Sequence, residues 1–306
     1  IQTAIDAGWK NIELREETYA GPVVIKNSET YLHGAGHASL ITCDATATGQ
    51  GLCVSVATSS LLTRIRLENF AIDNTNATNA GVGLDVSQTS HVVTDGLRVT
   101  DFELGHLYQD GTSNNSFYST FSNMIYFDNS SCFRTASTSA TTGGNLVNAN
   151  SMYSPRCRID SATGIGYNII NSEGWTFYSP NAEPASVIGT GMRIDGTSLG
   201  ITVINPWFES NATGTEILSG AATVKFFGGR ITAGTVGVYN RARTSFDNTL
   251  VTANTTNFNE TGILGAYWNA TTDYVSQFFG LGTTTPSSAH QRIGLQLATS
   301  DADADA

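Results

Sequence analysis

The stretch IRLENFAID, Ile65 to Asp73, decides the fold of this chain, because its pattern returns several times along the sequence. Each copy has a short apolar strand, a turn residue of the Asn, Asp or Gly type, and a second short strand. The later copies are HVVTDGLRVTD (91–101), YSTFSNMIYFD (118–128) and NLVNANSMYS (145–154). The turn residues align as Asn69, Asp95 or Gly96, Asn123 and Asn150, at steps of about 27 residues.

Further along the chain the same pattern continues with a shorter step. Asn205, Gly228 and Asn248 follow one another at steps of about 20 to 23 residues. A period of this length with several short strands is typical of a solenoid. Leucine-rich repeats do not fit, because the LxxLxL register is missing, and a propeller blade of roughly 40 residues is too long.

The pattern therefore predicts an all-β fold, a right-handed parallel β-helix. Its coils stack about 4.8 Å apart through backbone hydrogen bonds, with apolar side chains inside. Asn residues at the same corner of successive coils are expected to stack as a side-chain ladder.

The two ends of a solenoid need covering, since an open coil exposes unpaired backbone and apolar surface. IQTAIDAGW at the N-terminus places Ile1, Ile5 and Trp9 on one face of a helix, so we expect a short capping helix. From about Gly262 no coil register is visible. We expect a β-helix over 1–260 and a small C-terminal element, a trimerisation or tail segment, over 261–306.

Composition excludes several classes of function. The chain has 306 residues, of which 13% are charged and 40% are hydrophobic, and its net charge is -11. Such a composition argues against disorder. With three lysines in all, the chain lacks the clustered cations of a nucleic-acid footprint. No apolar run approaches the roughly 18 residues of a membrane helix. We therefore expect no nucleic-acid partner and no membrane insertion. Because the sequence does not open on Met, we expect a processed or partial product.

The four cysteines carry no metal signature. Cys43, Cys53, Cys132 and Cys157 show no CxxC spacing, and we expect buried free thiols, with pairing left open. We expect no metal site and no cofactor.

Two segments with the same short motif contain the first candidate catalytic residues. SPNAEPA (179–185) and NPWFESN (205–211) both contain Pro-x-x-Glu. If the two prolines occupy one position in consecutive coils, Glu183 and Glu209 stack with Cα atoms about 5 Å apart. Retaining glycosidases place two carboxyl groups at about 5 to 5.5 Å, and two like charges that close raise the pKa of one. The alternative is a structural corner, where each carboxylate accepts N–H groups of the turn.

Other residues complete the set of candidates. Glu173 is a further catalytic carboxylate, and Trp175 and Trp207 offer aromatic faces that suit a sugar ring. Arg156 and Arg158 share a strand face and suit an anionic sugar carboxylate, or else a salt bridge to a neighbouring Asp. Asp73, Asp101 and Asp128 recur about once per coil, so they suit calcium, a sugar groove or plain turn formation. We keep Asp128 as a substrate-binding candidate.

The sequence also resembles a known family. IQTAIDAG (1–8), NIELREETYAGPVVI (11–25) and TYLHGAGHASLITCD (30–44) resemble the opening of the pectate-lyase-like β-helix superfamily. Gly34, Gly36 and Ser39 match that family's GxGxxS turn. The NPWFESN coil is similar to coils of phage tailspikes, and FGLGTTTPSS (279–288) resembles the GIGTTSP segment near the C-terminus of many tail fibres and tailspikes.

The resemblance implies an extracellular virion tail protein. Such a tailspike or tail fibre is a homotrimer that contacts other virion tail proteins, and it binds and often depolymerises a bacterial surface polysaccharide. Hydrolysis is favoured over a lyase reaction because lysine is scarce. In a lyase, a basic residue would remove the proton α to a uronate carboxylate while Arg156 or Arg158 stabilises charge. The alternatives are a secreted monomeric polysaccharide lyase or glycoside hydrolase, and a non-enzymatic virion structural protein or adhesin.

Overall fold

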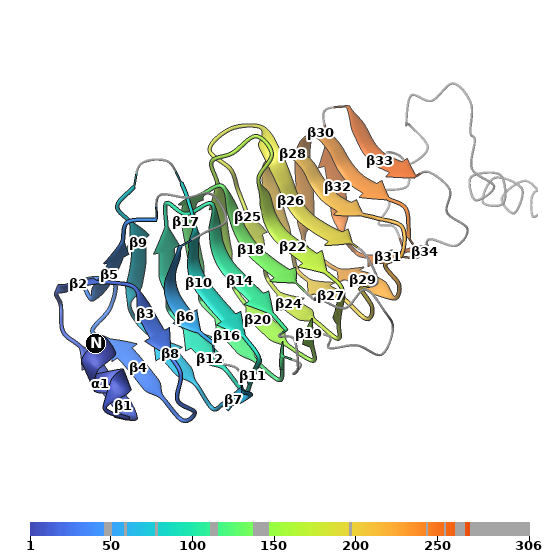
Figure 1. Cartoon of the computed structure of the whole chain (residues 1–306). Helices are drawn as coiled ribbons and strands as arrows, with labels where there is room; N and C mark the ends of the chain where they lie inside the picture. The colour runs from blue at the N-terminus through green and yellow to red at the C-terminus, as the bar shows by residue number, and fades with distance from the viewer. Residues whose placement is uncertain are drawn as a thin grey trace, which may run out of the picture. The chain divides into compact units, whose positions relative to one another are not determined.

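The computed structural model describes residues 1–45, 51–57, 60–76, 79–110, 116–136, 147–195, 198–242, 244–253, 255–260 and 267–269. The chain divides into two units, 1–269 and 270–306. The first unit is a right-handed parallel β-helix, as predicted, in which successive coils follow one another along the chain (Figure 1). The second unit, which includes FGLGTTTPSS, lies outside the described residues.

The coils contribute strands to parallel ladders that we call A, B1, B2 and C, with B1 and B2 joined in one sheet, and only some of the described coils have a strand in ladder C. Ladder A contains β1 (Asn11–Leu14), β4 (Tyr31–Gly34), β8 (Arg66–Glu68), β12 (Val93–Asp95), β16 (Thr120–Ser122), β20 (Ser151–Tyr153), β24 (Thr176–Tyr178), β27 (Thr202–Ile204), β29 (Val224–Phe227), β31 (Thr244–Asp247) and β34 (Tyr267–Asn269). Ladder B1 contains β2 (Thr18–Ala20), β5 (Leu40–Cys43), β9 (Ala71–Asn74), β13 (Arg98–Thr100), β17 (Ile125–Asn129), β21 (Arg156–Ile159), β25 (Asn181–Ala182), the first parts of β28 (Trp207–Ile217) and β30 (Arg230–Asn240), and β32 (Leu250–Ala253). Ladder B2 contains β3 (Val23–Ile25), β6 (Leu52–Val56), β10 (Val82–Ser87), β14 (Leu104–Gln109), β18 (Ser131–Ala136), β22 (Ile165–Ile170), β26 (Ile188–Asp195), the second parts of β28 and β30, and β33 (Thr256–Glu260). Ladder C contains β7 (Leu62–Thr63), β11 (Thr89–Ser90), β15 (Ser116–Phe117), β19 (Val147–Asn148) and β23 (Ser172–Glu173).

The register confirms the repeat read from the sequence. Arg66 pairs with Val93 and Val93 with Thr120, which are two steps of 27 residues. Later, Thr202 pairs with Lys225 and Lys225 with Ser245, at steps of 23 and 20 residues. Strand β34 still pairs with β31, so the coil pairing continues beyond the predicted end at residue 260.

The corner after each ladder A strand from β8 to β31 is defined by its backbone conformation. Its residues have a positive φ, between 48° and 63°, and from Asn69 to Gly228 the N–H of each donates to the carbonyl of the last ladder A residue in the next coil. They are Asn69, Gly96, Asn123, Ser154, Ser179, Asn205, Gly228 and Asn248. Asn and Gly tolerate this left-handed conformation best. Gly or Ser separates the Asn residues of this column, so the predicted side-chain ladder of Asn residues in successive coils is not formed among the described residues.

Asn150 was assigned to this corner wrongly. It is buried, and its Oδ1 accepts hydrogen bonds from the Ser119 N–H (2.8 Å) and the Tyr108 hydroxyl (3.0 Å) inside the coil. Its coil follows a longer step of 31 residues, from Thr120 to Ser151, so an alignment with equal steps selects the wrong residue. Ser154, with φ of 48°, is the corner residue of this coil.

The prediction of free thiols was also wrong, because Cys43 bonds to Cys53 and Cys132 to Cys157. In ladder B2, the register places Cys53 and Cys132 in the same column as Gly83 and Gly105. The residues of this column lie at a tight bend of the chain and face the interior. The space there is small, because a Cβ on Gly105 would lie 2.8 Å from the Cys132 carbonyl oxygen. The bend therefore brings two cysteines of B2 against cysteines of B1, a proximity that sequence spacing does not reveal.

The N-terminal helix α1 (Gln2–Asp6) covers the first coil, as predicted. Its Ile5 is fully buried. The Gln2 side chain accepts a hydrogen bond from the Val24 N–H (2.8 Å) and donates one to the Val24 carbonyl (3.2 Å), so it closes the open edge of β3. Trp9, however, lies beyond the helix and is 62% exposed, so its expected place on the apolar helix face was wrong. Among the described residues, no helix is long and apolar enough to span a membrane.

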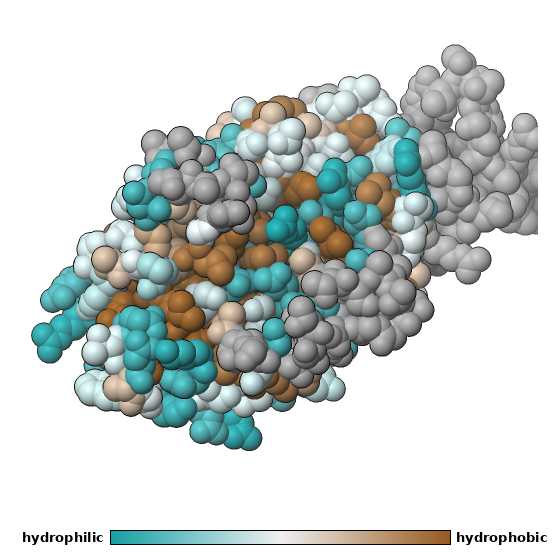
Figure 2. All heavy atoms as spheres, in the orientation of Figure 1, coloured by the Kyte–Doolittle hydropathy of each residue, from teal (hydrophilic) through white to brown (hydrophobic). Residues whose placement is uncertain are grey.

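The outer face of ladder B2 carries an apolar patch over β3, β6, β10 and β14 (Figure 2). Its members are Val24, Leu52, Val82, Leu104 and Leu107. The next strands of the same ladder are polar on this face, with Arg134, Asn168 and the ion pair between Arg193 and Glu216.

Candidate functional site

The outer face of ladder B1 gathers most of the candidate residues. Along each strand, side chains alternate between the interior and the surface. The inward column is buried throughout and consists of Ile72, Val99, Tyr126, Cys157, Ala182, Phe208, Ile231 and Val251. The outward residues just before it are Arg98, Ile125, Arg156, Asn181, Trp207, Arg230 and Leu250. Those just after it are Asp73, Thr100, Phe127, Arg158, Glu183, Glu209, Thr232 and Thr252.

The two Pro-x-x-Glu corners occupy the same place in consecutive coils, as predicted. Ala182 pairs with Phe208; Glu209 follows Phe208 within β28, and Glu183 follows Ala182 just beyond the end of β25. If this register extends by one residue, their Cα atoms lie about 4.8 Å apart, the spacing of adjacent strands. The Glu183 side chain is exposed, and Glu209 is half-buried. The Glu209 Oε2 accepts a hydrogen bond of 2.9 Å from the Trp207 indole N–H, so these two side chains share the outer face.

A groove on this face is lined by Glu183 together with the two predicted arginines. This groove, which we call the Arg158 groove, has a volume of about 570 Å³. It is lined by Ile125, Tyr126, Phe127, Arg156, Cys157, Arg158, Asn181, Glu183, Pro184 and Ala185. Strands β17, β21 and β25 therefore supply its floor, and the segment that follows β25 supplies one wall.

The two arginines flank the buried Cys157 and share the outer face, as predicted, but their surroundings differ. The Arg158 Nε lies 3.2 Å from Asp128 Oδ1, and its guanidinium carbon lies 4.7 Å from the centre of the Phe127 ring. The predicted alternative of a salt bridge to a neighbouring Asp is thus confirmed for Arg158. Arg156 is exposed and makes no ion pair among the described residues. Arg158 is therefore held by Asp128 and Phe127, whereas Arg156 faces solvent at the rim of the groove.

The next coil extends the same surface with Trp207 and Arg230. The Trp207 side chain is 45% exposed, and the Arg230 guanidinium carbon lies 5.6 Å from its ring centre. The Arg230 Nε donates to Thr232 Oγ1 at 2.7 Å. Aromatic and guanidinium groups on one strip favour a polar ligand with apolar ring faces and negative charge.

Two candidates lie elsewhere. Trp175 is completely buried, with its ring centre 5.4 Å from those of Phe133 and Phe177, so it belongs to the core and its prediction as a sugar-binding face was wrong. Glu173 is exposed on β23 of ladder C, where it pairs with Asn148. Ladder A separates it along the coil from Glu183, so the structure does not bring these carboxylates together.

The recurring aspartates form an acidic corner at the end of ladder B1. Asp101 and Asp128 have positive φ values of 65° and 54°, in keeping with turn formation, whereas Asp73 lies within β9 and pairs with Thr100. Burial, followed by the charges of Asp73, Asp128 and Asp160, raises the pKa of Asp101. Among the described residues, no group of three or more His, Cys, Asp or Glu side chains is placed to hold a metal ion.

Sequence reasoning missed several outward residues of B1, above all Phe127, Asn181 and Arg230. The signal was the strand alternation itself. Once Cys157 and Phe208 are taken as inward, the residues on either side of them point outward in every coil.

Comparison with known proteins supports the fold. No protein-family model matches the sequence, and no curated protein matches it. Among solved structures, the full-length tailspike protein 2 of Escherichia coli O157:H7 bacteriophage CAB120 has a TM-score of 0.63 at 12% identity, over 88% of this chain and 38% of that one. The gp42 tailspike of Acinetobacter phage vb_AbaP_AS12 has a TM-score of 0.61 at 12% identity, over 87% of this chain and 57% of that one.

An enzyme structure is also similar. The alginate lyase of Paenibacillus sp. str. FPU-7 has a TM-score of 0.56 at 16% identity, over 88% of this chain and 96% of that one. The chain thus covers less than two thirds of the length of either tailspike. At these identities the likeness concerns the fold, and the chain is a parallel β-helix of the kind found in these phage tailspikes and in this alginate lyase.

Proposed function

We propose that this protein binds a bacterial surface polysaccharide along the outer face of ladder B1 and depolymerises it by glycoside hydrolysis. The observation that supports this proposal is the pairing of Ala182 with Phe208, because Glu183 and Glu209 directly follow these partners in neighbouring coils. Carboxyl groups about 5 Å apart suit a retaining mechanism, in which one carboxylate attacks the sugar and the other transfers protons, and two side chains on coils about 4.8 Å apart can reach that separation.

The surroundings suit these roles. Glu209 accepts the indole N–H of Trp207, and this bond holds its carboxylate in one orientation. The exposed Trp207 ring offers a face for a sugar ring beside the carboxylates. Arg156 and Arg158 line the groove next to Glu183 and favour a glycan with acidic sugar residues.

The test compares three matched variants in one assay. Glu183→Gln and Glu209→Gln should each lower the release of new reducing ends from purified capsular and exopolysaccharides by about 100-fold or more. Glu173→Gln, a third exposed carboxylate on ladder C, should leave the rate unchanged. Thermal unfolding should be the same in all three. Full turnover in both first variants would remove the two carboxylates from the mechanism.

The second candidate is a lyase, which the exposed Arg156 in the groove favours. Such an enzyme abstracts the proton α to a uronate carboxylate, and a guanidinium stabilises the charge that develops. Its products carry an unsaturated uronate, so new absorbance from that group, in place of saturated reducing ends, would select this reading. Absence of both products on every polysaccharide that binds would favour a non-enzymatic adhesin.

The wider context of this proposal is a homotrimeric tailspike or tail fibre, located in the virion tail and attached to other tail proteins. The two similar tailspike structures support it, as does the FGLGTTTPSS segment by its resemblance to tail-fibre termini. A native mass of three chains in light scattering, lost on deletion of residues 278–297, is the expected result. A monomer would favour the secreted enzyme.

A further inference from the structure

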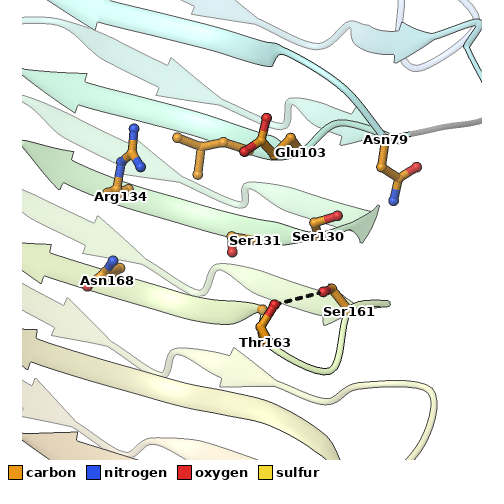
Figure 3. Close-up of a pocket in the computed structure, with 10 residues that line it drawn as sticks. Asn79, Glu103, Ser130, Ser131, Arg134, Ser161, Thr163 and Asn168 are labelled. Atoms are coloured by element: carbon orange, nitrogen blue, oxygen red, sulfur yellow. Dashed lines mark hydrogen bonds between the residues drawn. The ribbon is translucent and has the colours of Figure 1, made fainter. Parts of the chain in front are cut away.

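A second groove lies on the outer face of ladder B2, beside its junction with B1 (Figure 3). This groove, which we call the Arg134 groove, has a volume of about 290 Å³. It is lined by Asn79, Glu103, Leu104, Ser130, Ser131, Arg134, Ser161, Thr163, Gly164 and Asn168. None of these residues lines the Arg158 groove.

One end of the groove presents a cation next to an unsatisfied acceptor. Arg134 and Asn168 are register partners on β18 and β22, and Figure 3 shows both side chains at the same end. The Arg134 side chain is exposed and makes no ion pair among the described residues. The Asn168 Oδ1 is buried and has no hydrogen-bond partner among them. A buried carbonyl oxygen is unfavourable without a donor, and a bound hydroxyl would supply one.

The rest of the groove is rich in hydroxyl and amide groups. The Ser131 Oγ accepts the Ile165 N–H at 3.1 Å, which leaves its own proton available to a ligand. Ser161 and Thr163 bring their hydroxyl oxygens within 3.4 Å of each other. Glu103 adds an acidic acceptor, and Leu104 adds an apolar contact. Alternating donors and acceptors around a small apolar area match a sugar ring.

The far wall of the groove is held rigidly. The Asn79 side chain donates to the Asp128 carbonyl at 2.9 Å and to Asp160 Oδ2 at 2.7 Å, although these partners are 49 and 81 residues away in sequence. Asp128 also pairs with Arg158, so the acidic corner stands between the two grooves. The Arg158 groove lies over β17, β21 and β25, whereas the strand residues of the Arg134 groove belong to β14, β18 and β22.

We propose that the Arg134 groove binds an acidic sugar residue without cleaving it. The sugar carboxylate pairs with the Arg134 guanidinium, and a ring hydroxyl donates to Asn168 Oδ1. Ser131 and Glu103 contact further hydroxyls. Glu103 is the single carboxylate among the lining residues, so the groove lacks the carboxyl pair of a glycosidase. Its part is to anchor a chain, and this binding does not depend on the hydrolysis proposed for the Arg158 groove.

The test measures binding by saturation-transfer NMR and calorimetry. The probes are trisaccharides of galacturonate and of mannuronate, a hyaluronan tetrasaccharide, and neutral cellotriose. At least one acidic probe should bind more tightly than cellotriose. Arg134→Gln should weaken this binding about tenfold or more, as expected for loss of a charged hydrogen bond. Asn168→Leu should weaken it too while leaving thermal stability unchanged or higher, because it removes a buried unsatisfied oxygen.

Two controls separate this site from the other one. Arg193→Gln changes the next residue of the same column, which pairs with Glu216 outside the groove, and should bind normally. Arg158→Gln changes a residue that lines the first groove and does not line the second. Wild-type binding in both Arg134→Gln and Asn168→Leu, loss confined to Arg158→Gln, or no binding of any acidic probe would overturn the proposal. The rate of polysaccharide cleavage, measured in parallel, tests the other groove independently.

Discussion

Replacement of Asp85 by Asn should stabilise the fold near neutral pH and lose this effect in acid. Asp85 lies on β10 in ladder B2, where its register partner Leu107 belongs to the apolar patch. The residue is 3% exposed, and Gln109 Nε2 donates to its Oδ1 at 2.9 Å. Burial raises the pKa of Asp85 from 3.8 to about 6, although the bond from Gln109 acts in the opposite direction.

The sign of the effect follows from proton linkage. Because the pKa is higher in the folded chain than in the unfolded one, the stabilising contribution is complete below about pH 4 and is lost as pH rises through 6. The difference between 6 and 3.8, at 1.36 kcal/mol for each pKa unit, corresponds to about 3 kcal/mol. Above pH 6 the folded state therefore carries a buried charge, to which the neutral Gln109 side chain donates a hydrogen bond.

Asp85→Asn keeps an acceptor for Gln109 and removes this charge. We expect its free energy of unfolding to exceed that of wild type by up to about 3 kcal/mol near pH 7.5, with little difference near pH 4. Urea unfolding followed by tryptophan fluorescence at both pH values measures this, with the exposed Asp44→Asn as the control. An equal difference at both pH values, or a less stable variant near pH 7.5, would refute the assigned role of burial.

Three further predictions concern the groove surface and the core. Trp207→Ala should weaken polysaccharide binding about tenfold while Trp207→Phe retains most of it, because the ring face is the contact; calorimetry that found no loss in the Ala variant would exclude this role. Cys132→Ser with Cys157→Ser should lower the free energy of unfolding by about 3 kcal/mol, since the bond closes a loop with a sequence separation of 25; in urea unfolding, a change below about 1 kcal/mol would count against it. Gly214→Ala should cost about 1 to 3 kcal/mol, because its Cβ would meet Ile231 and would lie 2.6 Å from the Gly237 carbonyl oxygen; an unchanged melting temperature would contradict this packing.

Much of the candidate site was predictable because the two echoing corners are close in sequence and belong to successive coils. Pro180 and Pro206 mark the same position in consecutive coils. Glu183 and Glu209 follow these prolines at the same distance in sequence, so they occupy equivalent places. Arg156 and Arg158 share a face by the alternation of a single strand. These inferences need no knowledge of how distant segments meet.

Other assignments failed because they depended on which side of the coil a residue faces. Trp175 and Trp207 are alike as sequence signals, yet one is fully buried and the other is 45% exposed. Trp175 lies just before β24 and points into the core, whereas Trp207 begins β28 and points outward. Asn150 was assigned to the wrong position because its coil is longer. The extra residues displace the corner of that coil from the place that equal steps predict.

The sequence by itself determined the β-helix, its period of 20 to about 30 residues and its capping helix, because local alternation and turn residues repeat in every coil. The tertiary structure decided which cysteines pair, which tryptophan faces solvent, and that Arg134 and Asn168 form one end of a groove. These outcomes arise from contacts between ladders and between coils of unequal length. Small changes in coil length move such contacts without altering the local pattern that defines the fold.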